Sequence, residues 1–136
     1  MGEGLRVVDL CKLGAACALG AALALLSACD GYQERARVAA EMTGGDAERG
    51  RAAIRRYGCG TCHTIPGVEG AEAFVGPPLA HLPRRTYIAG VLTNTPDNLV
   101  RWVQDPPGVD PLTAMPKLGV TERDARDIAC YLYTLK

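Results

Sequence analysis

The sequence predicts an all-α domain over residues 46–136. Three stretches of that range begin with a helix-capping residue, and two of them continue with apolar residues at helical spacings of three and four. No stretch alternates convincingly between apolar and polar residues, as a half-exposed strand would. The chain has 16 glycines and 9 prolines but 1 phenylalanine and 1 tryptophan, so a bound cofactor is expected to supply part of the apolar interior.

Residues 1–28 are predicted to be a lipoprotein-type signal peptide. Arg6 and Lys12 precede an apolar run over 13–28, which is shorter than the roughly 20 residues of a membrane-spanning helix. The segment Leu26-Ser27-Ala28-Cys29 resembles a bacterial lipobox, in which the peptide is cut before the cysteine and that cysteine carries the lipid. The alternatives are an ordinary cleaved signal and a short uncleaved anchor. In each case the domain is exported, and lipid on Cys29 would anchor it on the periplasmic side of a bacterial membrane.

Residues 29–45 are predicted to be the lipidated cysteine and a flexible tether. The segment from 30 to 45 is polar and closes on the helix-breaking pair Gly44-Gly45. As a flexible coil it would reach roughly 20 Å, which would let the domain swing above its membrane.

The first helix of the domain is expected to start after Asp46 as its N-cap and to end near Gly58. Its apolar and small residues share one face at spacings of three and four: Ala47, Gly50, Ile54 and Tyr57. The stretch over 64–83 is rich in proline and glycine and has no sustained periodicity, so an irregular loop is expected there.

The second helix is expected to have Thr95 as its N-cap, Pro96 at its first position and an end near Gln104, where Asp105-Pro106-Pro107-Gly108 stops it. A loop with Met115 leads to the third helix, which is expected to begin at Thr121. The buried stripe of this last helix is predicted to be Ala125, Ile128, Ala129, Leu132 and Leu135.

The motif Cys59-Gly60-Thr61-Cys62-His63 is the attachment signature of c-type haem. Two residues between the thiols let both sulfurs reach the vinyl groups of one porphyrin, and the histidine that follows places its imidazole under the iron as an axial ligand. The alternative is a thiol-disulfide pair with an incidental histidine, which normally accompanies a βαβ pattern. The all-α context and export favour one covalently bound haem c.

Met115 and His81 are the candidates for the second axial ligand, because they are the only methionine and the only histidine after the motif. A lone methionine is often a core filler, but Met115 lies in a proline-bounded loop between two helices. A pair of His63 and Met115 suits electron transfer. Ligation by His81 and an open sixth position are the alternatives.

The remaining charges and thiols narrow the function further. Lysine and arginine number 15, as do aspartate and glutamate, and this balance disfavours nucleic acid as a partner.

Cys130 is expected to pack as a small apolar side chain within the last helix. Four arginines are candidates for docking or for pairing with haem propionates, with solvated surface charge as the alternative: Arg55, Arg56, Arg84 and Arg85.

These residues together resemble the class I cytochrome c family over 46–136, and the second half is most similar to the haem-c domain on subunit II of some terminal cytochrome c oxidases. The stretches that carry the resemblance are Gly76-Pro77-Pro78-Leu79, residues 94–99, Trp102 through Pro106, Thr113-Ala114-Met115-Pro116 and Tyr131-Leu132.

The resemblance implies a fold in which the N- and C-terminal helices cross around the haem. It implies that Pro77 offers its backbone carbonyl to His63, that Trp102 lies beside the sulfur of Met115, and that the hydroxyl of Thr113 approaches a haem propionate. It also implies that Gly50 lets the first helix approach Tyr131 closely.

By the same resemblance the chain is expected to be a non-enzymatic mono-haem electron carrier of a respiratory chain, with no small-molecule substrate. Its redox partners would be proteins such as a quinol-oxidising complex and a terminal oxidase. The oxidase subunit carries two membrane helices and a copper domain, so this chain is expected to be the haem module alone, anchored by lipid. The alternatives are a permanent haem-c subunit of an oxidase or related complex and a haem enzyme with an open sixth position.

Overall fold

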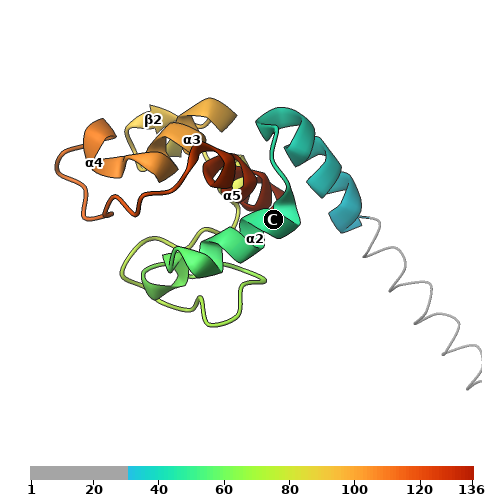
Figure 1. The fold of residues 1–136 in the computed structure, drawn as a ribbon, viewed down its shortest axis with the longest axis horizontal. Coiled ribbons are helices and arrows are strands. Elements are labelled where there is room, and N and C mark those ends of the chain that lie inside the picture. Colours follow the sequence, from blue (N-terminus) through green and yellow to red (C-terminus); the bar gives the residue numbers. More distant parts are fainter. Residues whose placement is uncertain (1–30) are drawn as a thin grey trace, which may run out of the picture. The chain divides into compact units, whose positions relative to one another are not determined.

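The computed structural model describes residues 31–136, of which Arg35–Lys136 form one compact unit (Figure 1). The predicted signal peptide over 1–28 and the predicted lipid site Cys29 lie outside the described residues. A helix over 31–43 is followed by α2 (Ala47–Arg56), η1 (Cys59–Thr61), η2 (Leu82–Arg84), β1 (Tyr87–Ile88), β2 (Leu92–Thr93), α3 (Pro96–Gln104), α4 (Pro106–Val109) and α5 (Glu122–Thr134). No helix of this described part is long and apolar enough to cross a membrane.

The three helix starts expected from the sequence are confirmed. Asp46 accepts a hydrogen bond from the backbone N–H of Arg49 at 2.8 Å, and Thr95 and Thr121 cap α3 and α5 in the same way. Each cap satisfies one of the N–H groups that a helix leaves unpaired in its first turn. Helix α3 ends at Gln104, before Asp105, as expected, and the short helix α4 follows with Asp105 as its N-cap.

Helix α2 crosses α5 with almost no space between the two backbones (Figure 1). A Cβ atom on Gly50 would lie 1.9 Å from the backbone oxygen of Asp127 and 3.0 Å from Cβ of Tyr131. Ile54 is buried one turn further along α2. The expected crossing of the first and last helices at Gly50 and Tyr131 is therefore present.

Asp127 joins the two helices at the same crossing, although its side chain is only 3% exposed. Its Oδ1 accepts from the backbone N–H of Asp46 at 2.7 Å and from Nη2 of Arg49 at 2.9 Å, and its Oδ2 accepts from Nε of Arg49 at 2.8 Å. The hydrogen bond to Asp127 raises the pKa of Arg49. Three donors compensate the buried carboxylate of Asp127 for its lost hydration. These hydrogen bonds therefore hold the start of α2 against α5.

The buried face of α5 follows the predicted stripe. Ala125, Ile128, Ala129, Leu132 and Leu135 are all buried. Cys130 is fully buried within the same helix, and burial raises the pKa of its thiol. Its predicted role as an apolar packing residue is confirmed.

The flexible tether predicted over 29–45 is wrong for the residues from 35 onward. Residues 35–43 continue a helix in which Ala39 and Thr43 are buried. Nε of Arg35 donates to the backbone oxygen of Thr134 at 3.0 Å, and Nη1 of Arg126 donates to the oxygen of Thr43 at 3.2 Å. The polar composition concealed a stripe of small residues at helical spacing, and contact with α5 stabilises a helix too short to persist alone.

A small hairpin is also present, in addition to the helices that were expected. Strands β1 and β2 pair antiparallel, with Tyr87 opposite Thr93 and Ile88 opposite Leu92. Ala89 and Gly90 have φ angles of 50° and 78°, as a type I′ hairpin turn requires. Strands of two residues are too short to show an alternating pattern, so sequence periodicity could not predict them.

We expect Gly50→Ala to lower the free energy of unfolding by about 1–3 kcal/mol, because its Cβ would overlap the backbone of α5. Helix propensity alone would favour alanine by about 1 kcal/mol. Denaturant unfolding measures whether Gly50→Ala lowers or raises the free energy of unfolding. Ala52→Gly, at an exposed position of α2, measures the contribution of helix propensity alone. Stabilisation by Gly50→Ala would contradict the close crossing.

A second prediction concerns acid stability. The hydrogen bond from Tyr57, joined by Thr121 and Arg56, lowers the pKa of Asp124. A lowered folded pKa contributes stability above the unfolded value, near pH 4, and that stability is lost as the pH falls further. We expect Asp124→Asn to unfold more easily at pH 7 and to lose less stability between about pH 5 and pH 2.

Asp97→Asn is the matched control for that measurement, because the Asp97 side chain is 91% exposed and its nearest ion-pair distance is 3.9 Å. Equal pH profiles for the two variants would show that the network at Asp124 contributes nothing to acid stability.

Candidate functional site

The end of α2 presents the Cys-x-x-Cys-His segment in a tight turn. Gly58 ends the helix in the left-handed conformation, with φ 70°, which costs glycine little. The backbone N–H groups of Cys62 and His63 then both donate to the oxygen of Cys59, at 3.3 and 3.1 Å. Residues three apart in a 3₁₀ turn point the same way, so this turn places both thiols on one side.

The imidazole of His63 is fixed by a backbone carbonyl. Its Nδ1 lies 2.8 Å from the oxygen of Pro77. The loop segment that carries Pro77 is itself held beside the motif by two backbone hydrogen bonds. The N–H of Gly76 donates to the oxygen of Cys62 at 2.7 Å, and the N–H of Leu79 donates to the oxygen of Thr64 at 2.8 Å. The contact that the resemblance implied between Pro77 and His63 is present.

This contact determines the chemistry of the ring. A carbonyl only accepts, so in the neutral imidazole Nδ1 carries the proton and the lone pair is on Nε2 of His63. Among the residues that the structure describes, Nε2 has no hydrogen-bond partner. His63 therefore offers one nitrogen that can ligate a metal and is half-buried beside the two cysteines.

Gly76 is a positioning residue that sequence reasoning did not identify as one. A Cβ at this position would lie 2.4 Å from Cε1 and 2.7 Å from Nδ1 of His63. The backbone of Gly76 therefore lies flat against the imidazole, and any larger residue would displace the ring. A glycine directly before the proline that accepts from His63 is the signal that could have indicated this.

The Cys59 thiol does not have the character of a reactive cysteine. Cys59 and Cys62 are both free and half-buried. Burial raises the pKa of the Cys59 thiol, whereas a reactive cysteine of a Cys-x-x-Cys oxidoreductase has a lowered pKa. The raised pKa of Cys59 therefore disfavours a role as the attacking thiol in disulfide exchange.

Met115 lies in the loop between α4 and α5, as expected. Its N–H donates to the hydroxyl of Thr113 at 3.2 Å, and the N–H of Thr113 donates to Asp110 at 3.1 Å. Met115 and Cys59 are both half-buried and pack against the same core cluster, which includes Trp102. The thioether of Met115 and Nε2 of His63 are thus the donors that could ligate the metal of a cofactor attached to the two cysteines.

His81 has different surroundings. It is exposed, adopts a left-handed φ of 58° before η2, and its backbone N–H donates to the oxygen of Lys136 at 3.2 Å. These features favour Met115 over His81 as the second donor.

Three of the four candidate arginines have structural partners. Arg55 pairs with Glu69 at 3.0 Å and Arg56 pairs with Asp124 at 2.8 Å. Arg85 donates to the backbone oxygens of Pro78 and Ala80 and so holds the loop that follows Pro77. The structure assigns no such partner to the exposed Arg84 within residues 31–136.

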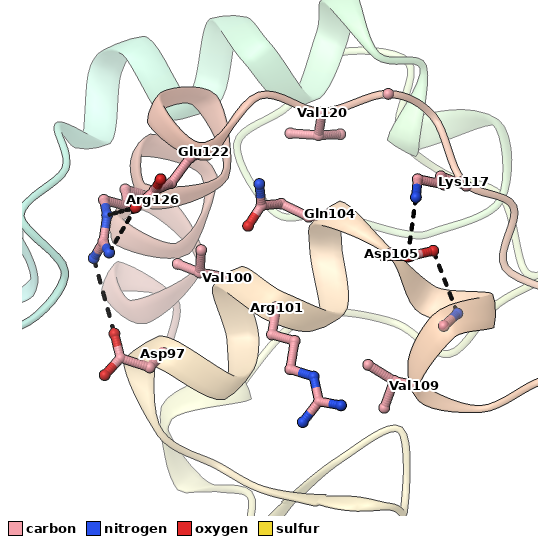
Figure 2. Close-up of a pocket in the computed structure, with 12 residues that line it drawn as sticks. Asp97, Val100, Arg101, Gln104, Asp105, Val109, Lys117, Val120, Glu122 and Arg126 are labelled. Carbon is pink, nitrogen blue, oxygen red and sulfur yellow. Dashed lines mark hydrogen bonds and ion pairs between the residues drawn. The ribbon is translucent and has the colours of Figure 1, made fainter.

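A groove of about 710 Å³ lies between α3, α4 and the start of α5 (Figure 2). Its rim carries ion pairs between Lys117 and Asp105 at 2.9 Å and between Arg126 and Glu122 at 3.0 Å. None of the predicted cofactor residues lines it, so the groove is separate from the candidate site.

The chain matches no protein-family model and no solved structure. It is similar to "Cytochrome c oxidase subunit 2" of Alkalihalophilus pseudofirmus strain OF4, with 32% identity over 91 residues that cover 66% of this chain and 26% of the relative. The protein of the same name in Bacillus subtilis strain 168 is 33% identical over 85 residues, or 58% of this chain and 24% of the relative.

The chain is related to cytochrome c oxidase subunit 2. It spans about a quarter of the length of these curated relatives.

We expect Gly76→Ala to displace the imidazole of His63 and to break its hydrogen bond to Pro77, since the new methyl group would occupy the position of the ring. NMR of the histidine ring nitrogens should show loss of the protected Nδ1 proton, and the free energy of unfolding should fall by about 1–3 kcal/mol. Val75→Ala, at the exposed neighbouring position, is the control. An unchanged ring signal in Gly76→Ala would contradict the positioning role.

Proposed function

We propose that this chain is a membrane-anchored mono-haem electron carrier of a respiratory chain, with the class I cytochrome c fold. One observation carries the proposal: Nδ1 of His63 is hydrogen-bonded to the backbone oxygen of Pro77. His63 directly follows the two cysteines of the motif. This arrangement leaves one imidazole nitrogen free for a metal and makes it more basic, which is what an axial ligand needs.

The residues of the site fit a covalently attached haem. Cys59 and Cys62 would hold it through thioethers, and His63 and Met115 would supply the axial ligands. The bound haem supplies one-electron exchange between ferric and ferrous iron. Both axial donors belong to segments that hydrogen bonds fix in place, at Pro77 and at Thr113.

The surroundings suit electron transfer rather than substrate chemistry. Trp102 is buried on α3 in the core cluster against which Met115 packs, and apolar side chains of this kind would exclude water from a bound haem. Thr113 is half-buried two residues before Met115, where its hydroxyl accepts from the backbone of that residue. These contacts hold the Met115 loop close to the core, so ligands need not exchange when the redox state changes.

The relation to oxidase subunit 2 supports a respiratory role for the carrier. Its partners would be redox proteins, such as a quinol-oxidising complex as donor and a terminal oxidase as acceptor. The lipobox at Cys29 supports an exported domain held by lipid on the periplasmic side of a bacterial membrane.

A second candidate function is a permanent haem-c subunit of an oxidase or related complex. The relatives are oxidase subunits, which is the observation that favours it. Co-purification with a membrane complex after mild detergent extraction would distinguish a fixed subunit from a free carrier.

Met115 variants test the carrier. We expect Met115→Ala to open the sixth coordination position, so that the ferrous protein binds carbon monoxide, whereas the unmodified protein resists it. Met115→His should keep a low-spin spectrum and lower the midpoint potential, because imidazole favours ferric iron more than a thioether does. Absorption spectra and redox titration of the purified protein measure both effects, and covalent haem should persist throughout.

His81→Ala is the matched control and should leave spectrum and potential unchanged. If His81→Ala alters them while Met115→Ala does not, the iron has two histidine ligands and the assignment of Met115 is wrong. If the purified chain carries no covalent haem at all, the proposed function fails.

A further inference from the structure

The helix over residues 35–43 packs against the folded domain where the sequence predicted a flexible tether. Ala39 and Thr43 are buried, and Ala36 and Ala40 pack against the core cluster. Hydrogen bonds from Arg35 to Thr134 and from Arg126 to Thr43 tie both ends of this segment to α5. A Cβ on Gly45 would lie 2.2 Å from the oxygen of Arg126, so the turn after the helix is equally close.

The length of chain before this helix limits how far the domain can stand from an anchor. Only six residue steps separate Cys29 from Arg35, which span at most about 21 Å. A fully flexible segment over 30–45 could extend to about 55 Å. A lipid on Cys29 would therefore keep the docked helix close to the bilayer.

This helix also has an apolar exposed face. Val38 and Met42 are 41% and 50% exposed, and their spacing of four places them one turn apart on the same side. The adjacent charges Arg37 and Glu41 pair with each other at 2.6 Å. An apolar pair beside a neutralised ion pair is suited to the boundary between lipid headgroups and acyl chains.

We propose that Val38 and Met42 rest on the lipid bilayer and hold the domain at a fixed distance from the membrane. This inference rests on the proposed lipidation of Cys29. The docked helix makes the protein a fixed carrier that moves with its anchor in the membrane plane, instead of one that swings on a tether. Its redox partners must then present their acceptor or donor sites near the same membrane surface.

Alkylation of introduced thiols tests the proposal. Three variants of the full chain are prepared with haem and lipid attached: Met42→Cys, Val38→Cys and Glu41→Cys. Each is placed in vesicles of phosphatidylethanolamine and phosphatidylglycerol. Each thiol is reacted with a charged, water-soluble maleimide and with an apolar, membrane-soluble one. Glu41 is the matched control, because it is exposed on the same helix next to Met42. Cys130 is buried, and Cys59 and Cys62 are consumed by the haem under the proposed function.

We expect the ratio of charged to apolar reagent incorporated at 38 and 42 to be roughly tenfold lower than at 41, because the bilayer excludes the charged reagent. Equal ratios at all three positions would overturn the proposal. So would protection of 38 and 42 from both reagents that grows with the protein-to-lipid ratio, since a second copy would then cover the face.

Failure of the anchor and failure of the carrier remain distinguishable. If the chain does not float with the vesicles, lipidation and this proposal both fail, while the haem spectrum of the same sample reports independently on the carrier. If the chain floats with an intact haem spectrum and the ratio of charged to apolar reagent at position 42 equals that at 41, lipidation and the carrier stand. Only the proposal that Val38 and Met42 face the bilayer is then wrong.

Discussion

The crossing of α2 and α5 is the constraint on which the rest of the structure depends. Gly50 removes the side chain that would keep the two backbones apart, and Asp127 binds the start of α2 through three donors. The direction of α2 is therefore fixed at its beginning, and its last turn delivers Cys59 to one place beside the core. A larger residue at Gly50 or a lost charge at Asp127 would move the motif that follows.

The candidate site is built mainly from backbone, around a few side chains with donor atoms. The loop after the motif is irregular, yet hydrogen bonds from Gly76 and Leu79 to the segment over 62–64 give it a defined course. Those bonds place the oxygen of Pro77 at the imidazole of His63. Arg85 fixes the same loop from its other side. A loop without regular secondary structure thus holds the His63 imidazole in one orientation.

Two features of the chain bear on how such a carrier would work. The Met115 loop is fastened to the core and is suited to keeping its ligand through a redox cycle. The helix over 35–43 is fastened to α5 and is suited to keeping the domain near its anchor. Both features restrict motion within the part of the chain that the structure describes.

The sequence by itself determined the features that are local. A capping side chain reaches only its own first turn, so Asp46, Thr95 and Thr121 could be placed without the fold. The spacing of Cys59, Cys62 and His63 is a local property too, and so is the periodic stripe of α5. Met115 as the second donor rests on the inventory of residues and on its loop position, and it stays a prediction.

The tertiary structure decided whatever depends on a distant partner. Residues 35–43 are polar enough to predict a tether, and only contact with Arg126 and Thr134 makes them a docked helix. Gly76 became a positioning residue because the fold lays the ring of His63 against it. Asp127 has the sequence environment of an exposed helical carboxylate, yet the approach of α2 buries it and supplies its donors. Local propensity acts over a few residues, whereas burial and close backbone contact arise only when segments far apart in the chain meet.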